Sequence, residues 1–403
     1  MNPIIVIGAG LAAWTTVREF RKLDTTTPIL MITADSGDFY AKPTLSNAFA
    51  QKKSPEQLVV TPAAKMVETQ GVTLLAHTPV LGFDPYVKTV TTVNGSHDFS
   101  ALVLATGALP IRLPVAGDAA EEVLSVNSLQ DFTSFYSALN MGASRRDAIL
   151  SSYENSSNRA IRVLIMGAGL IGCEFANDLI NAGFAVSVVD PAARPLAALL
   201  PEPASEQLRA ALANLGVNWH FGPTVQAVNH AAVSDQPSAA LQATLSNGEV
   251  LAADVVLSAI GLRADTRLAL AAGLSCERGI VVDTALQTSA PNVYALGDVA
   301  QYASAGNVTL PFVMPIMSAA RALAATLAGQ RTDLVFPIMP VAVKTPALPL
   351  LIASPGPGTT GGWQELETHV WQHLSAQGQR QGFILAGAQT SRRAEQVKAL
   401  QTQ

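Results

Sequence analysis

Cysteine is scarce in this chain, and its scarcity excludes several kinds of redox and metal site. The 403 residues include only two cysteines, Cys173 and Cys276, which lie far apart in the sequence. No closely spaced pair exists that could form a redox-active disulfide, and no set of four cysteines could hold zinc or an iron–sulfur cluster. Cys173 is expected to be a small packed side chain. If the protein stores electrons, a bound organic cofactor must hold them.

Charged residues are also few, and long apolar runs do not occur. Only 14% of the residues are charged and the net charge is -5, which argues against general nucleic-acid binding. No apolar run reaches the roughly 18 uncharged residues that a membrane span requires. The first apolar stretch is not preceded by the basic segment of a secretory signal. We therefore expect a cytoplasmic protein with no membrane span and no nucleic-acid partner.

Two glycine-rich motifs dominate what is present. Each follows a short apolar run typical of a buried parallel strand, at 4–7 and at 163–166. The motifs are Gly8-Ala9-Gly10-Leu11-Ala12-Ala13 and Gly167-Ala168-Gly169-Leu170-Ile171-Gly172. Such glycines permit a tight turn and a close approach of the backbone to a pyrophosphate, while the following helix aims its unpaired amides at the phosphates. The sequence therefore predicts two dinucleotide sites.

An acid should complete each site by accepting hydrogen bonds from the ribose hydroxyls of the adenosine. A strand over 29–33 leads to Asp35, and a strand over 186–189 ends at Asp190. Asp190 is the better candidate because it lies close to the expected spacing of about 20 residues after Gly167. Its carboxylate would repel a 2′-phosphate, which favours NADH over NADPH. The alternative is that Asp190 only caps the end of the strand, since acids favour turns.

Further strand-and-turn segments fill out the layout. A strand at 102–105 runs into Thr106 and Gly107, and a similar strand at 255–258 runs toward Gly261. A third strand, at 293–296, ends at Gly297 and Asp298. We expect the last two strands to return to the first domain.

Three other segments are expected outside these strands. A helix is predicted from about residue 315 to 327, with one apolar stripe along it. The polar stretch at 151–158 is expected to be a surface loop. The segment from about 330 to 403 should form a third small domain with short strands and a helical tail.

The order of these features resembles the flavoprotein family with two dinucleotide-binding domains, which includes glutathione, ferredoxin and rubredoxin reductases. The resemblance covers nearly the whole chain and rests on both glycine motifs together with 105–107, 259–261 and 294–298. It implies an α/β fold with two Rossmann-type domains, glutathione reductase-like, and a small α+β C-terminal domain. The implied boundaries are 1–112 with 246–328 for FAD, 113–245 for NAD and 329–403 for the C-terminal domain.

The resemblance also implies the cofactors and their ligands. The first motif would hold FAD and the second NADH, while Asp298 would bind the flavin ribityl chain where Gly297 lets the backbone come close. Ten residues would line the FAD: Leu11, Ala12, Thr33, Ala34, Lys42, Val80, Glu174, Asp298, Val313 and Lys344.

Within the family, the stretches at 31–43, 170–179 and 343–346 are most similar to the rubredoxin reductases. This implies an NADH-dependent flavoprotein oxidoreductase that passes single electrons to rubredoxin in an alkane-hydroxylase system, and that acts as a monomer. NADH gives up two electrons as a hydride whereas a rubredoxin iron accepts one, so the flavin must release them singly. Ferredoxin reductases usually carry arginine at Lys42 and lysine at Asn47, so a ferredoxin reductase feeding an oxygenase is the alternative.

Lys42 and Glu174 are the expected catalytic pair beside the flavin. The lysine would favour electron density on the reduced ring and the glutamate would hold the lysine in place. The alternative is a plain surface ion pair without a catalytic role. Lys344 lies in an apolar run where an unpaired amine is costly, so we expect a flavin carbonyl or an acid as its partner. The alternative is that Lys344 stands at a strand end and extends its own amine into solvent.

A pair of histidines and several basic residues give weaker indications of function. His369 and His373 have the spacing of helical metal ligands, but the segment is more typical of a strand and further ligands are not apparent, so no metal is expected. Residues 326–403 hold six basic against four acidic residues, and Lys52 and Lys53 are further candidates for steering an acidic rubredoxin. A flavin-binding signalling protein without useful turnover is the alternative from another functional class.

Overall fold

The structure is a computed structural model that describes residues 2–150, 160–231, 240–356 and 358–401. The surface loop predicted at 151–158 lies outside the described residues. The chain forms two compact units, each assembled from three segments. Unit 1 comprises Met1–Ala41, Val59–Leu109 and Leu262–Met339, and unit 2 comprises Lys42–Leu58, Pro110–Gly261 and Pro340–Gln403.

Unit 1 is built on a five-stranded parallel sheet with the order β18-β7-β1-β2-β3. Its strands are β1 (Ile4–Ile7), β2 (Ile29–Ile32), β3 (Thr73–Leu75), β7 (Ala101–Leu104) and β18 (Val293–Ala295). Four of them occupy the strands predicted at 4–7, 29–33, 102–105 and 293–296, which are thereby confirmed. Both faces of a parallel sheet are covered, which explains the nearly unbroken runs of Ile, Leu, Val and Met.

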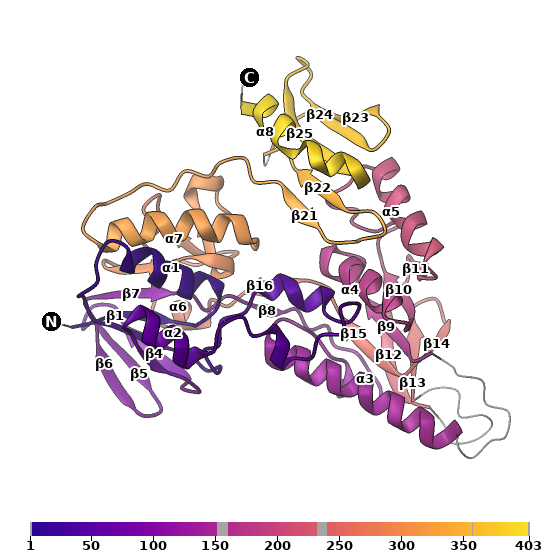
Figure 1. Ribbon diagram of the computed structural model, residues 1–403, viewed down its shortest axis with the longest axis horizontal. Coiled ribbons are helices and arrows are strands. Elements are labelled where there is room, and N and C mark those ends of the chain that lie inside the picture. The colour runs from indigo at the N-terminus through magenta and orange to yellow at the C-terminus, as the bar shows by residue number, and fades with distance from the viewer. Residues whose placement is uncertain (1, 151–159, 232–239, 357, 402–403) are drawn as a thin grey trace. The chain divides into compact units, whose positions relative to one another are not determined.

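Two helices of unit 1 pack directly against each other, α1 (Leu11–Arg21) and α7 (Val313–Leu327), as Figure 1 shows. The predicted helix at 315–327 is confirmed. Of the predicted stripe, Ala319, Ala320 and Leu323 are completely buried, and Leu327 is half-buried. Small side chains at this contact allow the two helices to approach closely.

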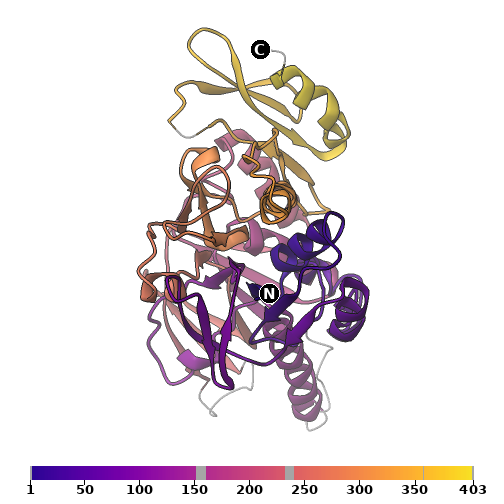
Figure 2. The same ribbon diagram turned by 90° about the vertical axis from the view of Figure 1, so that its left-hand side faces the viewer.

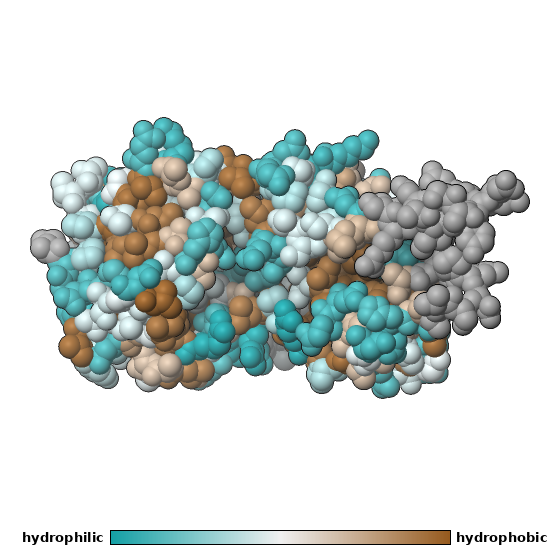
Figure 3. Space-filling view, turned by 90° about the horizontal axis from the view of Figure 1, so that it is seen from below, coloured by the Kyte–Doolittle hydropathy of each residue, from teal (hydrophilic) through white to brown (hydrophobic). Residues whose placement is uncertain are grey.

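The remaining elements of unit 1 are short. They are α2 (Ala63–Gln70), β4 (Val80–Asp84), β5 (Thr89–Thr92), β6 (Gly95–Asp98), β8 (Ala108–Pro110), β16 (Leu262–Ala264), α6 (Arg267–Ala271), β17 (Ile280–Val282), η4 (Gly297–Val299), β19 (Ala300–Tyr302), η5 (Ala303–Ala305) and β20 (Val308–Thr309). The strands β4, β5 and β6 form an antiparallel sheet whose exposed apolar residues include Leu81, Val87 and Val93. Hydrophobic and hydrophilic side chains are interspersed on the face in Figure 3.

Unit 2 contains a second parallel sheet with the order β11-β10-β9-β15. Its strands are β9 (Arg162–Met166), β10 (Ala185–Asp190), β11 (Asn218–Phe221) and β15 (Val255–Ser258). The prediction that the strand at 255–258 returns to the first domain is wrong, because β15 pairs in parallel with β9 of this sheet. An apolar run fits either buried parallel sheet, so the hydrophobic pattern cannot choose between them.

This part of unit 2 also contains elements outside that sheet. They are η1 (Lys42–Asn47), η2 (Glu56–Leu58), η3 (Ala120–Glu122), α3 (Leu129–Leu150), α4 (Leu170–Asn181), α5 (Glu202–Asn214) and the antiparallel strands β12 (Val225–His230), β13 (Leu241–Leu245) and β14 (Val250–Ala253). None of the helices in the described ranges is both long and apolar enough to cross a lipid bilayer.

The C-terminal segment of unit 2 forms an antiparallel sheet with the order β21-β22-β25-β24-β23. Its elements are β21 (Val341–Val343), β22 (Leu350–Ala353), β23 (Gly362–Glu367), β24 (Val370–Leu374), β25 (Arg380–Ala386), η6 (Gly387–Arg392) and α8 (Arg393–Gln401). The helix α8 packs beside β25 (Figure 2). The strand expected around His373 is confirmed, and Nδ1 of its ring lies 3.0 Å from Gln381 Oε1. Among the described residues no cluster of His, Cys, Asp and Glu could hold a metal ion.

Candidate active site

The first glycine motif lies between β1 and α1 in unit 1 and has the shape of a phosphate cradle. Gly8 has φ +113°, and a Cβ atom there would lie 2.4 Å from the carbonyl oxygen of Ala105, so the position requires glycine. A Cβ atom on Gly10 would meet nothing within 4 Å. The first turn of α1 holds no acidic residue, and Gly10 provides no side-chain cap. The open space beside unpaired helix amides fits a pyrophosphate.

The second motif repeats this geometry in unit 2, between β9 and α4. Gly167 has φ +104°, and an added Cβ atom would lie 2.7 Å from the carbonyl oxygen of Ala259. A Cβ atom on Gly172 would lie 1.9 Å from the carbonyl oxygen of Gly167, whereas one on Gly169 would meet nothing within 4 Å. The three glycines thus provide the turn, the open approach and the close packing of the helix that a dinucleotide site requires.

Asp190 ends β10 directly beside the second motif. Its Oδ2 accepts a hydrogen bond from the Ala168 amide at 2.6 Å, and its Oδ1 accepts one from the Ala192 amide at 2.7 Å. The carboxylate therefore caps the backbone at the end of the strand, as the alternative interpretation predicts. It also lies against the glycine turn, where a ribose ligand should lie. Asp35 follows β2 in unit 1 and is exposed.

Asp298 stands in a turn of unit 1 that a buried tyrosine braces. The preceding Gly297 has φ +81°, and a Cβ atom there would lie 2.9 Å from the Cβ atom of Ala12 in the first motif. The Gly297 amide donates to Tyr302 Oη at 2.7 Å, and that hydroxyl donates to the Gly297 carbonyl at 3.2 Å. Tyr302 is completely buried, and this burial raises the pKa of its phenol. A neutral tyrosine thus holds the backbone beside Asp298.

A buried ion pair in unit 2 joins Glu174 of α4 to Lys344, which follows β21. Glu174 Oε2 lies 2.8 Å from Lys344 Nζ and accepts a hydrogen bond from Ser46 Oγ at 2.6 Å. Glu174 Oε1 accepts a hydrogen bond from the Lys344 amide at 2.9 Å. The glutamate side chain is 1% exposed and that of the lysine is 34% exposed. An acid is therefore the partner of Lys344, as one of the predicted alternatives states.

The predicted pairing of Lys42 with Glu174 is wrong. Lys42 Nζ instead donates to Asn127 Oδ1 at 3.2 Å. Lys42 begins η1, and it is Ser46, one turn later, that meets the glutamate. The alternative of a plain surface pair is wrong as well, because Glu174 is buried. The lysine that reaches the glutamate is distant in sequence, and no local pattern links the two.

Two more polar residues of α4 hold neighbouring backbone. Asp178 accepts hydrogen bonds from the amides of Phe49 at 2.9 Å and Ala50 at 3.0 Å, and Asn177 Oδ1 accepts one from the Ala347 amide at 3.0 Å. Burial raises the pKa of Asp178, while the hydrogen bonds from the Ala50 and Phe49 amides oppose that shift. The segments 42–58 and 344–347 are thus both fixed to α4.

Sequence reasoning missed Ser46, Asn177, Asp178 and Tyr302. A usable signal existed for the two α4 residues, because with Glu174 they form an i, i+3, i+4 row of polar side chains on a helix that is otherwise apolar up to Asn181 at its end. No comparable signal marks Tyr302, whose partner is a backbone group.

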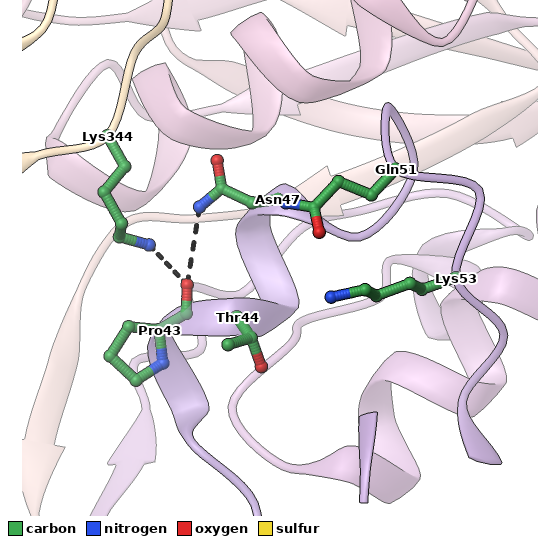
Figure 4. Close-up of a pocket in the computed structure, with 6 residues that line it drawn as sticks. All are labelled: Pro43, Thr44, Asn47, Gln51, Lys53 and Lys344. Atoms are coloured by element: carbon green, nitrogen blue, oxygen red, sulfur yellow. Dashed lines mark hydrogen bonds between the residues drawn. The ribbon is translucent and has the colours of Figure 1, made fainter. Parts of the chain in front are cut away.

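A pocket of about 340 Å³ opens beside this ion pair in unit 2. Figure 4 shows its six lining residues: Pro43, Thr44, Asn47, Gln51, Lys53 and Lys344. Lys344 Nζ and Asn47 Nδ2 both donate to the Pro43 carbonyl oxygen. The amine of Lys53 points into the space between these side chains (Figure 4), and it has no hydrogen bond or ion pair with any residue that the structure describes.

The other predicted cofactor residues are distributed over both units. Unit 1 holds Leu11, Ala12, Ala13, Thr33, Ala34, Val80, Thr106, Gly107 and Val313, and unit 2 holds Leu170, Ile171 and Gly261. Thr33 is buried at the end of β2, and Thr106 donates to the Asp265 carbonyl at 3.2 Å. Their contacts with a cofactor stay a prediction.

Comparison with known proteins places this geometry among redox enzymes. Residues 2–325 match the family described as pyridine nucleotide-disulphide oxidoreductase, and residues 333–400 match the family described as rubredoxin binding C-terminal domain. A protein of Alcanivorax borkumensis named rubredoxin-NAD(+) reductase is 45% identical over 390 residues, which cover 96% of this chain and 95% of that protein. A protein of Acinetobacter baylyi with the same name is 40% identical over 395 residues, which cover 96% of this chain and 95% of that protein.

The fold also matches solved structures. The crystal structure of the covalent putidaredoxin reductase–putidaredoxin complex superposes with a TM-score of 0.84 at 23% identity, covering 99% of this chain and 93% of that chain. At this identity the likeness concerns the fold alone. Together with the two parallel sheets and the C-terminal antiparallel sheet, it confirms the predicted α/β fold class.

Proposed function

The chain belongs to the pyridine nucleotide-disulphide oxidoreductase family, and from that membership we propose that it is an NADH-dependent reductase that delivers electrons to rubredoxin. The observation that carries the proposal is the rubredoxin-binding match at 333–400, directly after the oxidoreductase match. Two relatives similar over 96% of the chain are named rubredoxin-NAD(+) reductase. A ferredoxin reductase would not account for the C-terminal match.

The cofactors of this enzyme are FAD and NADH. We propose that the cradle at Gly8 and Gly10 holds the FAD pyrophosphate, with Asp298 on the ribityl chain, and that the cradle at Gly167 and Gly169 holds NADH. The open space at the second glycine of each motif supports this assignment. When bound, the flavin accepts a hydride from NADH and gives up the two electrons one at a time.

The residues of unit 2 keep a positive charge in a fixed place. Glu174 holds the ammonium of Lys344 beside the carbonyl oxygen of Pro43, and it binds the Lys344 amide as well. We propose that Lys344 and Lys42 contact the flavin and that Glu174 is a positioning residue for Lys344. A positive charge fixed in this way would favour electron density on a bound flavin, because the lysine needs no reorganisation to provide it.

We also propose domain bounds, a cellular location and a downstream enzyme. We propose FAD-binding segments at 1–112 and 246–328, an NAD-binding region at 113–245 and a C-terminal domain at 329–403. The strand β15 is moved from the second FAD-binding segment to the NAD-binding region, because it pairs with β9. We propose that the reaction takes place in the cytoplasm, because NADH is a coenzyme of that compartment. We also propose that the enzyme is a monomer. The reduced rubredoxin would supply a monooxygenase of the alkane-hydroxylase type.

A direct comparison of carriers tests the proposed function. Purified holoenzyme with NADH is mixed with rubredoxin or with a plant-type or putidaredoxin-type ferredoxin, and reduction of each carrier is followed by its absorbance. We expect rapid reduction of rubredoxin. Reduction of ferredoxin without reduction of rubredoxin would overturn the proposal.

A further inference from the structure

Resting on the proposed function, we propose that the pocket beside the Glu174–Lys344 pair is a docking site for an acidic side chain of rubredoxin, with Lys53 as its recognition residue. The pocket offers the amine of Lys53 and the side-chain amide groups of Asn47 and Gln51, whereas the amine of Lys344 already binds Glu174, Ser46 and the Pro43 carbonyl. Such a set of donors fits a carboxylate.

The charge of the pocket is only partly neutralised by the protein. Glu174 balances Lys344, but Lys53 has no ionic partner among the described residues, and the neighbouring Lys52 is exposed. The segment 42–58 carries three lysines and one glutamate, a local net charge of +2 in a chain of net charge -5. A positive patch of this kind steers an acidic partner protein toward it.

The segment that presents Lys53 is anchored before any partner arrives. Asp178 binds the amides of Phe49 and Ala50, and the Lys53 amide donates to the Ala48 carbonyl at 3.0 Å. The Phe49 ring packs against Phe132 at a centroid distance of 5.2 Å. A preorganised amine loses little conformational entropy when it binds a carboxylate.

The site also adjoins the part of the chain that matches a rubredoxin-binding domain. Lys344, on one side of the pocket, lies within the matched residues 333–400, and Lys53 lies outside them. The docking surface therefore extends from the C-terminal domain onto the segment 42–58. The pocket has no glycine-rich turn, the feature that marks phosphate sites elsewhere in this chain, which favours a protein carboxylate over a nucleotide phosphate as its occupant.

A charge reversal at Lys53 tests the proposal. The holoenzyme variants are Lys53→Glu and Lys53→Arg, with Lys65→Glu as the control of equal charge change at an exposed lysine that pairs with Glu68. For each, kcat/KM is measured for rubredoxin and for an uncharged quinone, at low and high ionic strength. The ratio of the two values separates docking from the reaction with NADH.

We expect Lys53→Glu to lower this ratio by about tenfold at low ionic strength and by much less in high salt, as for a steering charge. The ratios of Lys53→Arg and Lys65→Glu should stay within about twofold of wild type. Equal ratios for Lys53→Glu and Lys65→Glu, in an enzyme that reduces rubredoxin, would overturn the docking site alone. A raised KM for NADH in Lys53→Glu would assign the pocket to the nucleotide instead. A wild-type enzyme that fails to reduce rubredoxin would remove both proposals.

Discussion

Glu174 binds three donors at once and is almost completely enclosed. Its partners are Ser46 Oγ, the amide of Lys344 and the amine of Lys344. A buried carboxylate is stable only when its desolvation is offset by such bonds. The residue therefore determines where the Lys344 amine can lie.

Replacing Glu174 with glutamine keeps the size of the side chain but removes its charge. The new amide presents a donor toward Lys344, so we expect the free energy of unfolding to fall by about 1 to 3 kcal/mol. Urea unfolding of the purified protein measures the change. Glu68→Gln, at a residue whose side chain is 71% exposed, is the matched control and should stay close to wild type. Equal stability of the two variants would show that the ion pair is not structural.

Tyr302 stabilises the turn before Asp298 through hydrogen bonds with the amide and the carbonyl of Gly297. Tyr302→Phe leaves both backbone groups buried without this partner, which we expect to lower the free energy of unfolding by about 1 to 3 kcal/mol. FAD should also bind more weakly to the apoprotein, because the turn before Asp298 loses its brace. Fluorescence titration with FAD measures that affinity. Tyr86→Phe, at an exposed tyrosine, is the control; equal FAD affinity in both variants would contradict the role given to Tyr302.

The helix α4 acts as an element through its row of Glu174, Asn177 and Asp178. These side chains hold the segments 42–58 and 344–347, which lie more than half the chain length apart in the sequence. The same helix begins at the second glycine motif. One element thus positions both the proposed nicotinamide cradle and the lysine pocket of unit 2.

The raised pKa of Asp178 makes the strength of this anchor depend on pH. Its folded pKa lies above the ordinary value of 3.8, and burial is the main cause. Such an acid contributes stability that is fully present below its unfolded pKa and is lost as the pH rises through the folded pKa. We therefore expect the stability advantage of wild type over Asp178→Asn to shrink as the pH rises from about 4 toward neutral. Denaturant unfolding across this range measures it, and an advantage that grows with pH would contradict the burial argument.

The contact between α4 and its glycine turn gives a prediction with an internal control. Gly172→Ala would place a Cβ atom 1.9 Å from the Gly167 carbonyl oxygen, whereas Gly169→Ala meets nothing within 4 Å. We expect Gly172→Ala to destabilise the fold by about 1 to 3 kcal/mol, as overpacking does. Gly169→Ala should preserve stability and weaken NADH binding, because the added methyl fills the phosphate approach. Thermal unfolding and NADH titration distinguish the two variants. Equal stability of both would show that the contact between position 172 and the Gly167 carbonyl adjusts without cost.

At the scale of the whole molecule, the sequence predicts what depends on local pattern. Both glycine motifs, their strands and the helix at 315–327 follow from apolar runs and obligatory glycines, and the structure contains them. The sequence does not predict that Lys344 is the partner of Glu174, because the packing of segments 170 positions apart brings the two residues together. The pattern at 255–258 does not predict which sheet β15 joins, because an apolar run fits either parallel sheet. Local chemistry thus predicts the cradles, while the pocket depends on tertiary contacts.

The central claim is that one chain converts the hydride of NADH into single electrons for rubredoxin. An anaerobic titration tests it most directly: the holoenzyme is reduced with NADH and then mixed with oxidised rubredoxin, while the flavin and rubredoxin absorbances are recorded together. Because a hydride carries two electrons and each rubredoxin iron accepts one, we expect bleaching of the flavin by NADH, its recovery on mixing, and two rubredoxins reduced for each NADH consumed. A flavin that NADH does not bleach, or one that stays reduced in the presence of oxidised rubredoxin, would contradict the account.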